Sequence, residues 1–177
     1  MRKLIILGLF IFIWNNHSAQ VGKNFPILNG KTLDDKACSL PIKNAKFSVI
    51  AIAFNRDAED DLKKWLNPLF QTFIKDEKES SKGIDVADVY DVNFMFVPVI
   101  AGFKRFADEF KKDTDPRFWQ YILDTEKTDM RGLQEKLGIQ DSKIPYFFIV
   151  NAEGKIVEMQ SGKFLKTKID KLEDAVE

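Results

Sequence analysis

Histidine and cysteine are almost absent from this 177-residue chain, which contains one of each. The histidine is His17, in an N-terminal segment that we expect to be removed, so the mature protein would have no imidazole. This excludes Ser-His-Asp and Cys-His nucleophile systems and ordinary zinc or copper sites. The cysteine is Cys38, and a single cysteine can form neither an intramolecular disulfide nor a C-x-x-C motif. We therefore predict no metal site and no cofactor.

An excess of one sign of charge is also missing. The chain has 27 Lys and Arg residues and 27 Asp and Glu residues, for a formal net charge of +0 at pH 7. The two signs are mixed along the sequence, and this balance favours neither nucleic acid nor an anionic membrane surface as a partner. Asp85, Asp88 and Asp91 are regularly spaced, but their stretch lacks the glycine and the distal glutamate of a calcium loop. We interpret these acids as solvated surface.

The N-terminus has the pattern of a secretory signal peptide. Two basic residues precede an apolar run over residues 4–14, and a polar stretch then ends at Ala19. The run is shorter than the roughly 20 residues that span a membrane comfortably. We predict a signal peptide over residues 1–19, a single domain over residues 20–177 and a periplasmic or secreted location. No stable membrane span is expected after cleavage, although an uncleaved segment would act as an anchor.

The first strong structural signals are an apolar strand and a long helix. Residues 47–54 are nearly all apolar and rich in β-branched residues, which predicts a buried central strand. Asp57 is the predicted N-cap of the following helix, with further acids in its first turn. Pro68 lacks a backbone donor, so we expect a kink there. The helix carries a core-facing apolar stripe of Leu62, Trp65, Leu66, Leu69, Phe70 and Phe73.

Strands and helices continue to alternate along the chain. In order, the pattern predicts a strand ending at Val97, a helix marked by Phe103, Phe106 and Phe110, a short strand over 121–123, a helix over 130–137, a hairpin of strands over 146–150 and 155–159, and a closing helix with Leu165, Ile169, Leu172 and Val176 on one face. Before the first strand, we predict a turn at Asn29-Gly30 and a loop over residues 38–41. Parallel units followed by a hairpin imply an α/β fold, with a mixed central sheet and helices on both faces.

One segment resembles a known superfamily. The run Ile-Pro-Tyr-Phe-Phe-Ile-Val-Asn-Ala-Glu-Gly-Lys-Ile-Val, over residues 144–157, resembles the thioredoxin superfamily. The Phe25-Pro26 opening and the segments over 121–124 and 133–139 are similar to its peroxiredoxin-like branch. The resemblance covers almost the whole chain after the signal peptide. It implies the three-layer thioredoxin-like fold and a cis peptide bond before Pro145.

A narrower resemblance is to the thioredoxin-like assembly factors of mitochondrial ATP synthase and their bacterial relatives. It rests on the pair Ala53-Phe54, the stretch from Ala58 to Leu62, Trp65, and the helix around Phe106.

The chain departs from redox-active members of the superfamily at their reactive position. Their catalytic cysteine lies just after the first core strand, where a helix N-terminus lowers the pKa of the thiol. The corresponding residues here are 54–59, Phe-Asn-Arg-Asp-Ala-Glu, and they contain no sulfur. The resemblance therefore implies the fold without its redox centre.

The superfamily docks extended polypeptide beside its cis-proline, and the resemblance implies a partner-binding groove at the same place in this chain. The residues of that groove would be Asn55, Arg56, Asp57, Ile144, Pro145 and Tyr146. Alternatively, these are ordinary capping and turn residues of a degenerate site.

Cys38 is the other candidate site, either as a partly buried apolar residue or as a lone reactive thiol. We predict no catalytic residue, and thus a redox-inactive protein of the cell envelope that binds an unidentified protein partner in a chaperone or assembly role. A weak thiol-dependent oxidoreductase or peroxidase using Cys38 is the alternative. A small-molecule carrier with an apolar pocket near Pro145 is a third hypothesis.

Overall fold

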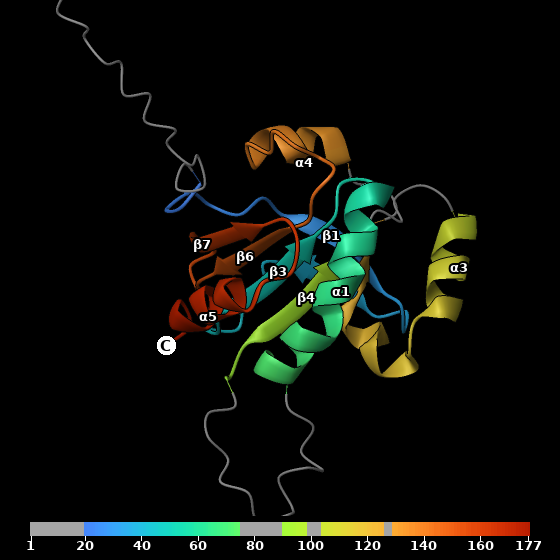
Figure 1. Ribbon diagram of the computed structural model, residues 1–177, viewed down its shortest axis with the longest axis horizontal. Coiled ribbons are helices and arrows are strands. Elements are labelled where there is room, and N and C mark those ends of the chain that lie inside the picture. The colour runs from blue at the N-terminus through green and yellow to red at the C-terminus, as the bar shows by residue number, and fades with distance from the viewer. Residues whose placement is uncertain (1–19, 75–89, 99–103, 126–128) are drawn as a thin grey trace, which may run out of the picture.

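The computed structural model of the protein describes residues 20–74, 90–98, 104–125 and 129–177 (Figure 1). The signal peptide predicted over residues 1–19 lies outside these residues and stays a prediction. The same holds for Asp85, Asp88 and Phe103.

A four-stranded sheet forms the centre of the molecule, in the order β4-β3-β6-β7. β3 (Ser48–Ile52) is parallel to β4 (Asn93–Val97) and antiparallel to β6 (Tyr146–Val150). β6 continues through a hairpin into β7 (Ile156–Ser161). All residues of β3 and β6 are buried, which explains why their sequences are continuous apolar runs. The mixed sheet expected from the sequence is confirmed.

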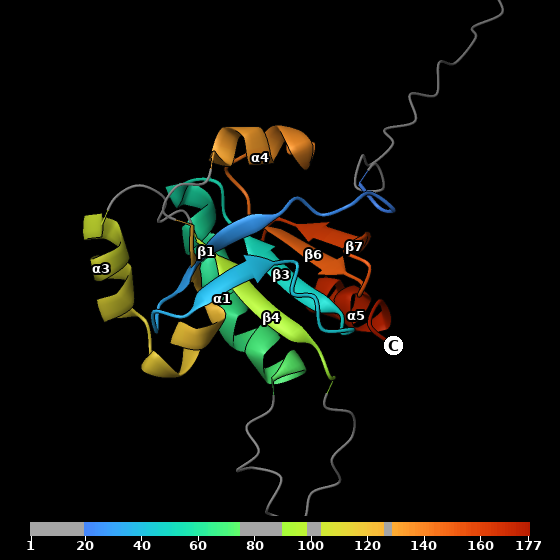
Figure 2. The same ribbon diagram turned by 180° about the vertical axis from the view of Figure 1, so that it is seen from behind.

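Each face of this sheet has its own apolar core, because successive side chains of a strand point to opposite faces. The set that includes Val49 packs with the long helix α1 (Arg56–Phe73) and with α5 (Lys166–Asp174). The set that includes Ile50 packs with α4 (Met130–Lys136) and the N-terminal strands. Figure 1 shows α1 and α5 in front of the sheet, and Figure 2 shows the N-terminal strands on its other side.

A second, smaller sheet has the order β2-β1-β5. β1 (Leu28–Thr32) pairs antiparallel with both β2 (Ala37–Leu40) and β5 (Leu123–Asp124). α3 (Lys104–Asp113) and the 3-10 helix η2 (Pro116–Tyr121) precede β5 along the chain. The two sheets meet at a parallel bridge between residues 96 and 122.

The N-terminal hairpin differs from the sequence-based expectation. Asn29 and Gly30 lie inside β1 instead of in a turn, and the chain reverses over residues 33–36, where Asp35 has a φ of 67°. Residues 38–40 belong to β2, although the sequence predicted a loop. In β2, the exposed Ala37 and Ser39 alternate with the partly buried Cys38 and the buried Leu40, and pairing with β1 fixes the strand, so its own sequence gives little strand signal.

One detail of α1 also differs from expectation. Its N-cap is Asn55, not Asp57, which lies in the first turn. The helix continues through Pro68 to Phe73, where the buried side chains of its last turns hold it against the sheet.

Candidate functional site

The candidate site lies where the carboxyl ends of β3 and β4 meet the start of α1. The backbone N–H of Ala53 donates to the carbonyl oxygen of Val97 (3.1 Å), which extends the pairing of the two strands by one residue. Asn55 then adopts an extended backbone, with φ −154° and ψ 178°, and its side-chain oxygen accepts a hydrogen bond from the N–H of Ala58 at 3.0 Å. Asn55 can cap the helix in this way because its short side chain reaches back to the first turn.

The loop before β6 forms the second side of the site. The side-chain amide of Asn55 donates to the hydroxyl oxygen of Ser142 at 3.2 Å. This hydrogen bond joins Asn55 to the loop that precedes Ile144 and Pro145, while the groove itself stays a prediction.

Pro145 is buried and continues the ladder of β6. Its carbonyl oxygen accepts a hydrogen bond from the N–H of Gly162 at 2.8 Å, immediately beyond the pairing of Tyr146 with Ser161. The bond between Ile144 and Pro145 is trans. Among the described residues the only cis peptide bond is Leu40–Pro41, so the cis-proline implied for position 145 is wrong.

Tyr146 is a buried residue that packs beneath the loop before β6. Its side chain is only 6% exposed, and its hydroxyl donates to the carbonyl oxygen of Asp141 at 2.9 Å. Its ring contacts Phe54 edge to face, with centroids 6.0 Å apart. Burial raises the pKa of Tyr146. Tyr146 therefore fixes the loop and does not offer itself to a partner.

The six predicted groove residues consequently divide into three groups. Arg56 and Asp57 are exposed, Asn55 and Ile144 are half-buried at the rim, and Pro145 and Tyr146 are buried beneath it. A partner could reach the first two groups. The last two residues act as support.

Three residues that the sequence did not suggest also shape this region. Ser142 binds Asn55, and Gly162 binds Pro145. The indole N–H of the fully buried Trp65 donates to the carbonyl oxygen of Gly162 at 3.1 Å. This hydrogen bond connects α1 to the residue that follows β7. These contacts join segments far apart in the chain, and no local pattern could have revealed them.

A comparison with protein families identifies the chain, because residues 11–177 match the family model described as "ATP10 protein". The chain belongs to the ATP10 protein family. This confirms the predicted similarity to ATP-synthase assembly factors. A comparison with the curated proteins finds no significant match.

Solved structures that resemble this ATP10 family member are thioredoxin-like. The thioredoxin domain of a thiol-disulfide oxidoreductase from Bacteroides vulgatus superposes with a TM-score of 0.59, at 18% identity, over 89% of this chain and 98% of that one. Yeast Sco1 with copper bound gives a TM-score of 0.55 at 19% identity, over 89% of this chain and 92% of that chain. StoA from Bacillus subtilis gives 0.52 at 17% identity, over 86% and 98%. The predicted thioredoxin-like fold is confirmed.

Cys38 lies in the small sheet, on β2, whereas the candidate site follows β3 of the large sheet. It is partly buried, pairs opposite Gly30, and its side chain packs against the core on the α4 face. Burial raises the pKa of its thiol. Because the thiolate is the reactive form, this environment disfavours nucleophilic chemistry.

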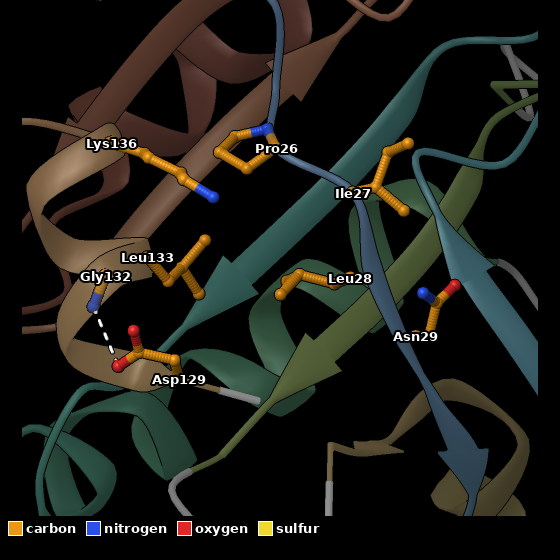
Figure 3. A pocket seen from close by; sticks show the side chains of 8 residues that line it. All are labelled: Pro26, Ile27, Leu28, Asn29, Asp129, Gly132, Leu133 and Lys136. Carbon is orange, nitrogen blue, oxygen red and sulfur yellow. Dashed lines mark hydrogen bonds between the residues drawn. The ribbon is translucent and has the colours of Figure 1, made fainter. Parts of the chain in front are cut away.

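A separate cavity of about 360 Å³ lies between the start of β1 and α4 (Figure 3). Leu28, Leu133 and Lys136 point into it, and the exposed Ile27 lies at its edge. The carboxylate of Asp129 caps α4 by accepting a hydrogen bond from the N–H of Gly132 at 3.0 Å. None of the six predicted groove residues lines this cavity.

Within the described parts of the chain, no three His, Cys, Asp or Glu side chains are arranged to hold a metal ion. In the same parts, no helix has both the length and the apolar character needed to cross a bilayer.

Proposed function

We propose that this ATP10 family member is a redox-inactive, exported protein that binds a polypeptide partner at the rim formed by Asn55, Arg56, Asp57 and Ile144. Its role would be that of a chaperone or assembly factor. Membership of the ATP10 family is the observation that carries the proposal, and it favours a subunit of ATP synthase as the partner.

The missing thiol supports redox inactivity. The helix start that lowers a thiol pKa in redox-active thioredoxin-like proteins is occupied here by Asn55, whose side chain caps the helix. The one cysteine of the chain lies elsewhere, and burial raises its pKa. With one cysteine the chain cannot resolve a mixed disulfide by itself, so any disulfide exchange at Cys38 would need an external thiol.

The geometry of the rim supports partner binding. Arg56 and Asp57 present opposite charges at consecutive exposed positions, and Ile144 contributes a half-buried apolar side chain. Hydrogen bonds from Asn55 to Ser142 and from Gly162 to Pro145 hold both sides of the rim in place. A preorganised surface of this kind binds a segment with little loss of its own entropy.

Photo-crosslinking in living cells tests the rim directly. A photoreactive residue at Arg56 should capture a defined partner, whereas the same residue at Glu153, on the exposed β6–β7 turn, should not. The double variant Arg56→Glu, Asp57→Lys should abolish a capture made from position 144. Equal capture from positions 56 and 153, or unchanged capture in the double variant, would count against the rim.

The proposed partner has its own test. Deletion of the gene in its host should lower the amount of assembled ATP synthase on native gels while leaving the levels of its individual subunits less affected. A chain that carries Cys38→Ser should restore assembly fully, because the proposed role uses no thiol.

The exported location rests on the predicted signal peptide over residues 1–19. Fractionation of the host cells, with N-terminal sequencing of the purified protein, should find a chain that begins near Gln20 outside the cytoplasm. A protein that starts at Met1 in the cytoplasmic fraction would contradict it.

The alternative of a thiol enzyme predicts a different result. Disulfide-reductase and peroxidase assays of the protein beside its Cys38→Ser variant should both give background rates under our proposal. A rate above background that disappears with the substitution would establish the alternative.

A further inference from the structure

The segment around the connection between β7 and α5 is positively charged. Residues 160–169, from the end of β7 to the first turn of α5, contain Lys163, Lys166 and Lys168 and no Asp or Glu, in a chain whose charges balance overall. The even balance of the whole sequence conceals this local positive segment.

The same connection exposes two large apolar side chains. Phe164 is 38% exposed and Leu165 is 55% exposed, and they are neighbours in the sequence. All five residues from Lys163 to Thr167 are exposed, so this part of the chain faces solvent. We define residues 163–166, Lys-Phe-Leu-Lys, as the 163–166 tip.

Hydrogen bonds hold the tip in its exposed position. The ammonium group of Lys168 donates to the carbonyl oxygens of Ser161 (2.6 Å) and Lys163 (3.0 Å). The ring of Phe164 contacts the buried indole of Trp65 on α1 edge to face, with centroids 5.3 Å apart. The exposure of Phe164 and Leu165 therefore belongs to an ordered loop.

We propose that the 163–166 tip docks on the surface of an anionic lipid bilayer. Phe164 and Leu165 would enter the boundary between headgroups and acyl chains, and Lys163 and Lys166 would remain at the lipid phosphates. Two exposed apolar side chains with a lysine on each side match the apolar interior and the anionic surface of such a bilayer. This inference does not rest on the rim at Asn55, and it fails or holds separately from the proposed function.

Residues 4–14 of the full chain could themselves bind lipid. The test therefore uses a dye that reports only on the surroundings of the 163–166 tip. A polarity-sensitive dye is attached to full-length protein at Thr167→Cys, in a Cys38→Ser background. The matched control carries the dye at Ala152→Cys, on the exposed β6–β7 turn. Each protein is mixed with vesicles of phosphatidylglycerol and phosphatidylcholine, or of phosphatidylcholine alone.

We expect the dye at position 167 to shift to shorter wavelength only with the anionic vesicles, and the shift to fall with added salt. The dye at position 152 should not shift. Phe164→Ser with Leu165→Ser should abolish the shift, and Ile27→Ser, which removes another exposed apolar side chain, should leave it unchanged.

Charge removal gives a second measure that does not touch the core. Lys163→Gln and Lys166→Gln should each lower the ratio of membrane-bound to free tips roughly fivefold. The proposal is overturned if the dye at 167 does not shift, if it shifts equally on neutral vesicles, or if these variants have no effect. Capture of a polypeptide by a photoreactive residue at position 165, without any vesicle-induced shift, would show a protein surface in its place.

Discussion

The side-chain amide of Asn55 and the hydroxyl of Ser142 lie 3.2 Å apart and join two segments that are 87 residues apart in the sequence. The side-chain oxygen of Asn55 at the same time accepts the N–H of Ala58. One side chain thus both begins α1 and holds the loop that precedes Pro145. Asn55 therefore has a structural role at the start of α1.

Substitutions at Asn55 should separate these two roles. Asn55→Ala removes the helix cap and the bond to Ser142, and it should lower the free energy of unfolding by about 1–3 kcal/mol. Asn55→Asp keeps a cap but loses the donor to Ser142, so it should cost about 1 kcal/mol, similar to Ser142→Ala. Urea titration measures all three. Equal stability of Asn55→Ala and Ser142→Ala would contradict the capping role.

The parts of the fold that the sequence predicted are those in which burial alone decides the structure. β3, β6 and the stripe of α1 are buried on the faces that their apolar patterns indicate. The apolar pattern of each segment follows from which of its residues are buried, so the pattern can be interpreted without knowing what the segment contacts.

The parts that the sequence did not predict depend on distant neighbours. β2 exists because β1 pairs with it, and Gly30 lies in a strand because the backbone of Asp124 approaches it. For the candidate site, the pattern could not show that Tyr146 is buried or that Ser142 accepts a hydrogen bond from Asn55. The cis bond assigned to Pro145 came from the resemblance, and this chain does not follow its relatives there.

Gly30→Ala should show how closely the two strands approach. A Cβ at position 30 would lie 2.2 Å from the carbonyl oxygen of Asp124 and 3.1 Å from a side-chain carbon of Leu123, so β1 and β5 would have to separate. We expect a loss of about 1–3 kcal/mol in the free energy of unfolding. Ser39→Ala, at an exposed position on β2, is the control and should change stability little. Stability of Gly30→Ala equal to that of the control would refute the close contact.

The ring and the indole N–H of Trp65 should make separate contributions to the free energy of unfolding. The ring is fully buried and contacts Phe147, with centroids 4.0 Å apart. Trp65→Ala should therefore cost about 3–5 kcal/mol. Trp65→Phe keeps most of the apolar contact and loses the hydrogen bond to Gly162, so it should cost only about 1 kcal/mol from that bond, plus the smaller ring. Thermal unfolding followed by near-ultraviolet circular dichroism compares them, and an equal loss in both variants would be inconsistent with this division.

The thiol of Cys38 should react slowly. Burial raises its pKa, so less thiolate is present near neutral pH than for an exposed cysteine. Alkylation by iodoacetamide should be slower than at Ala152→Cys in a Cys38→Ser background, and its rate should keep rising at a higher pH than the rate of that reference. Faster alkylation of native Cys38 would instead support the thiol-enzyme alternative.

The closing helix should become more stable as Glu173 takes up a proton. Burial raises the pKa of Glu173 above its ordinary value of 4.5, and the carboxylates of Asp170, Glu177 and Asp174 raise it further. A carboxyl whose pKa is raised by folding stabilises the protein below its unfolded pKa, and that contribution is lost as the pH rises through the folded pKa.

Glu173→Gln should therefore stabilise the protein at neutral pH, by less than about 1 kcal/mol because solvent screens these charges. The difference in free energy of unfolding between the variant and the wild type should decrease as the pH falls to about 4. In that range Glu173 becomes protonated in the unfolded chain as well as in the folded one. Glu153→Gln, on the β6–β7 turn, serves as the control for the loss of one negative charge. Melting curves across this pH range measure the difference. A difference that stays constant with pH, or a variant less stable than the wild type at neutral pH, would mean that the charged form of Glu173 does not oppose folding.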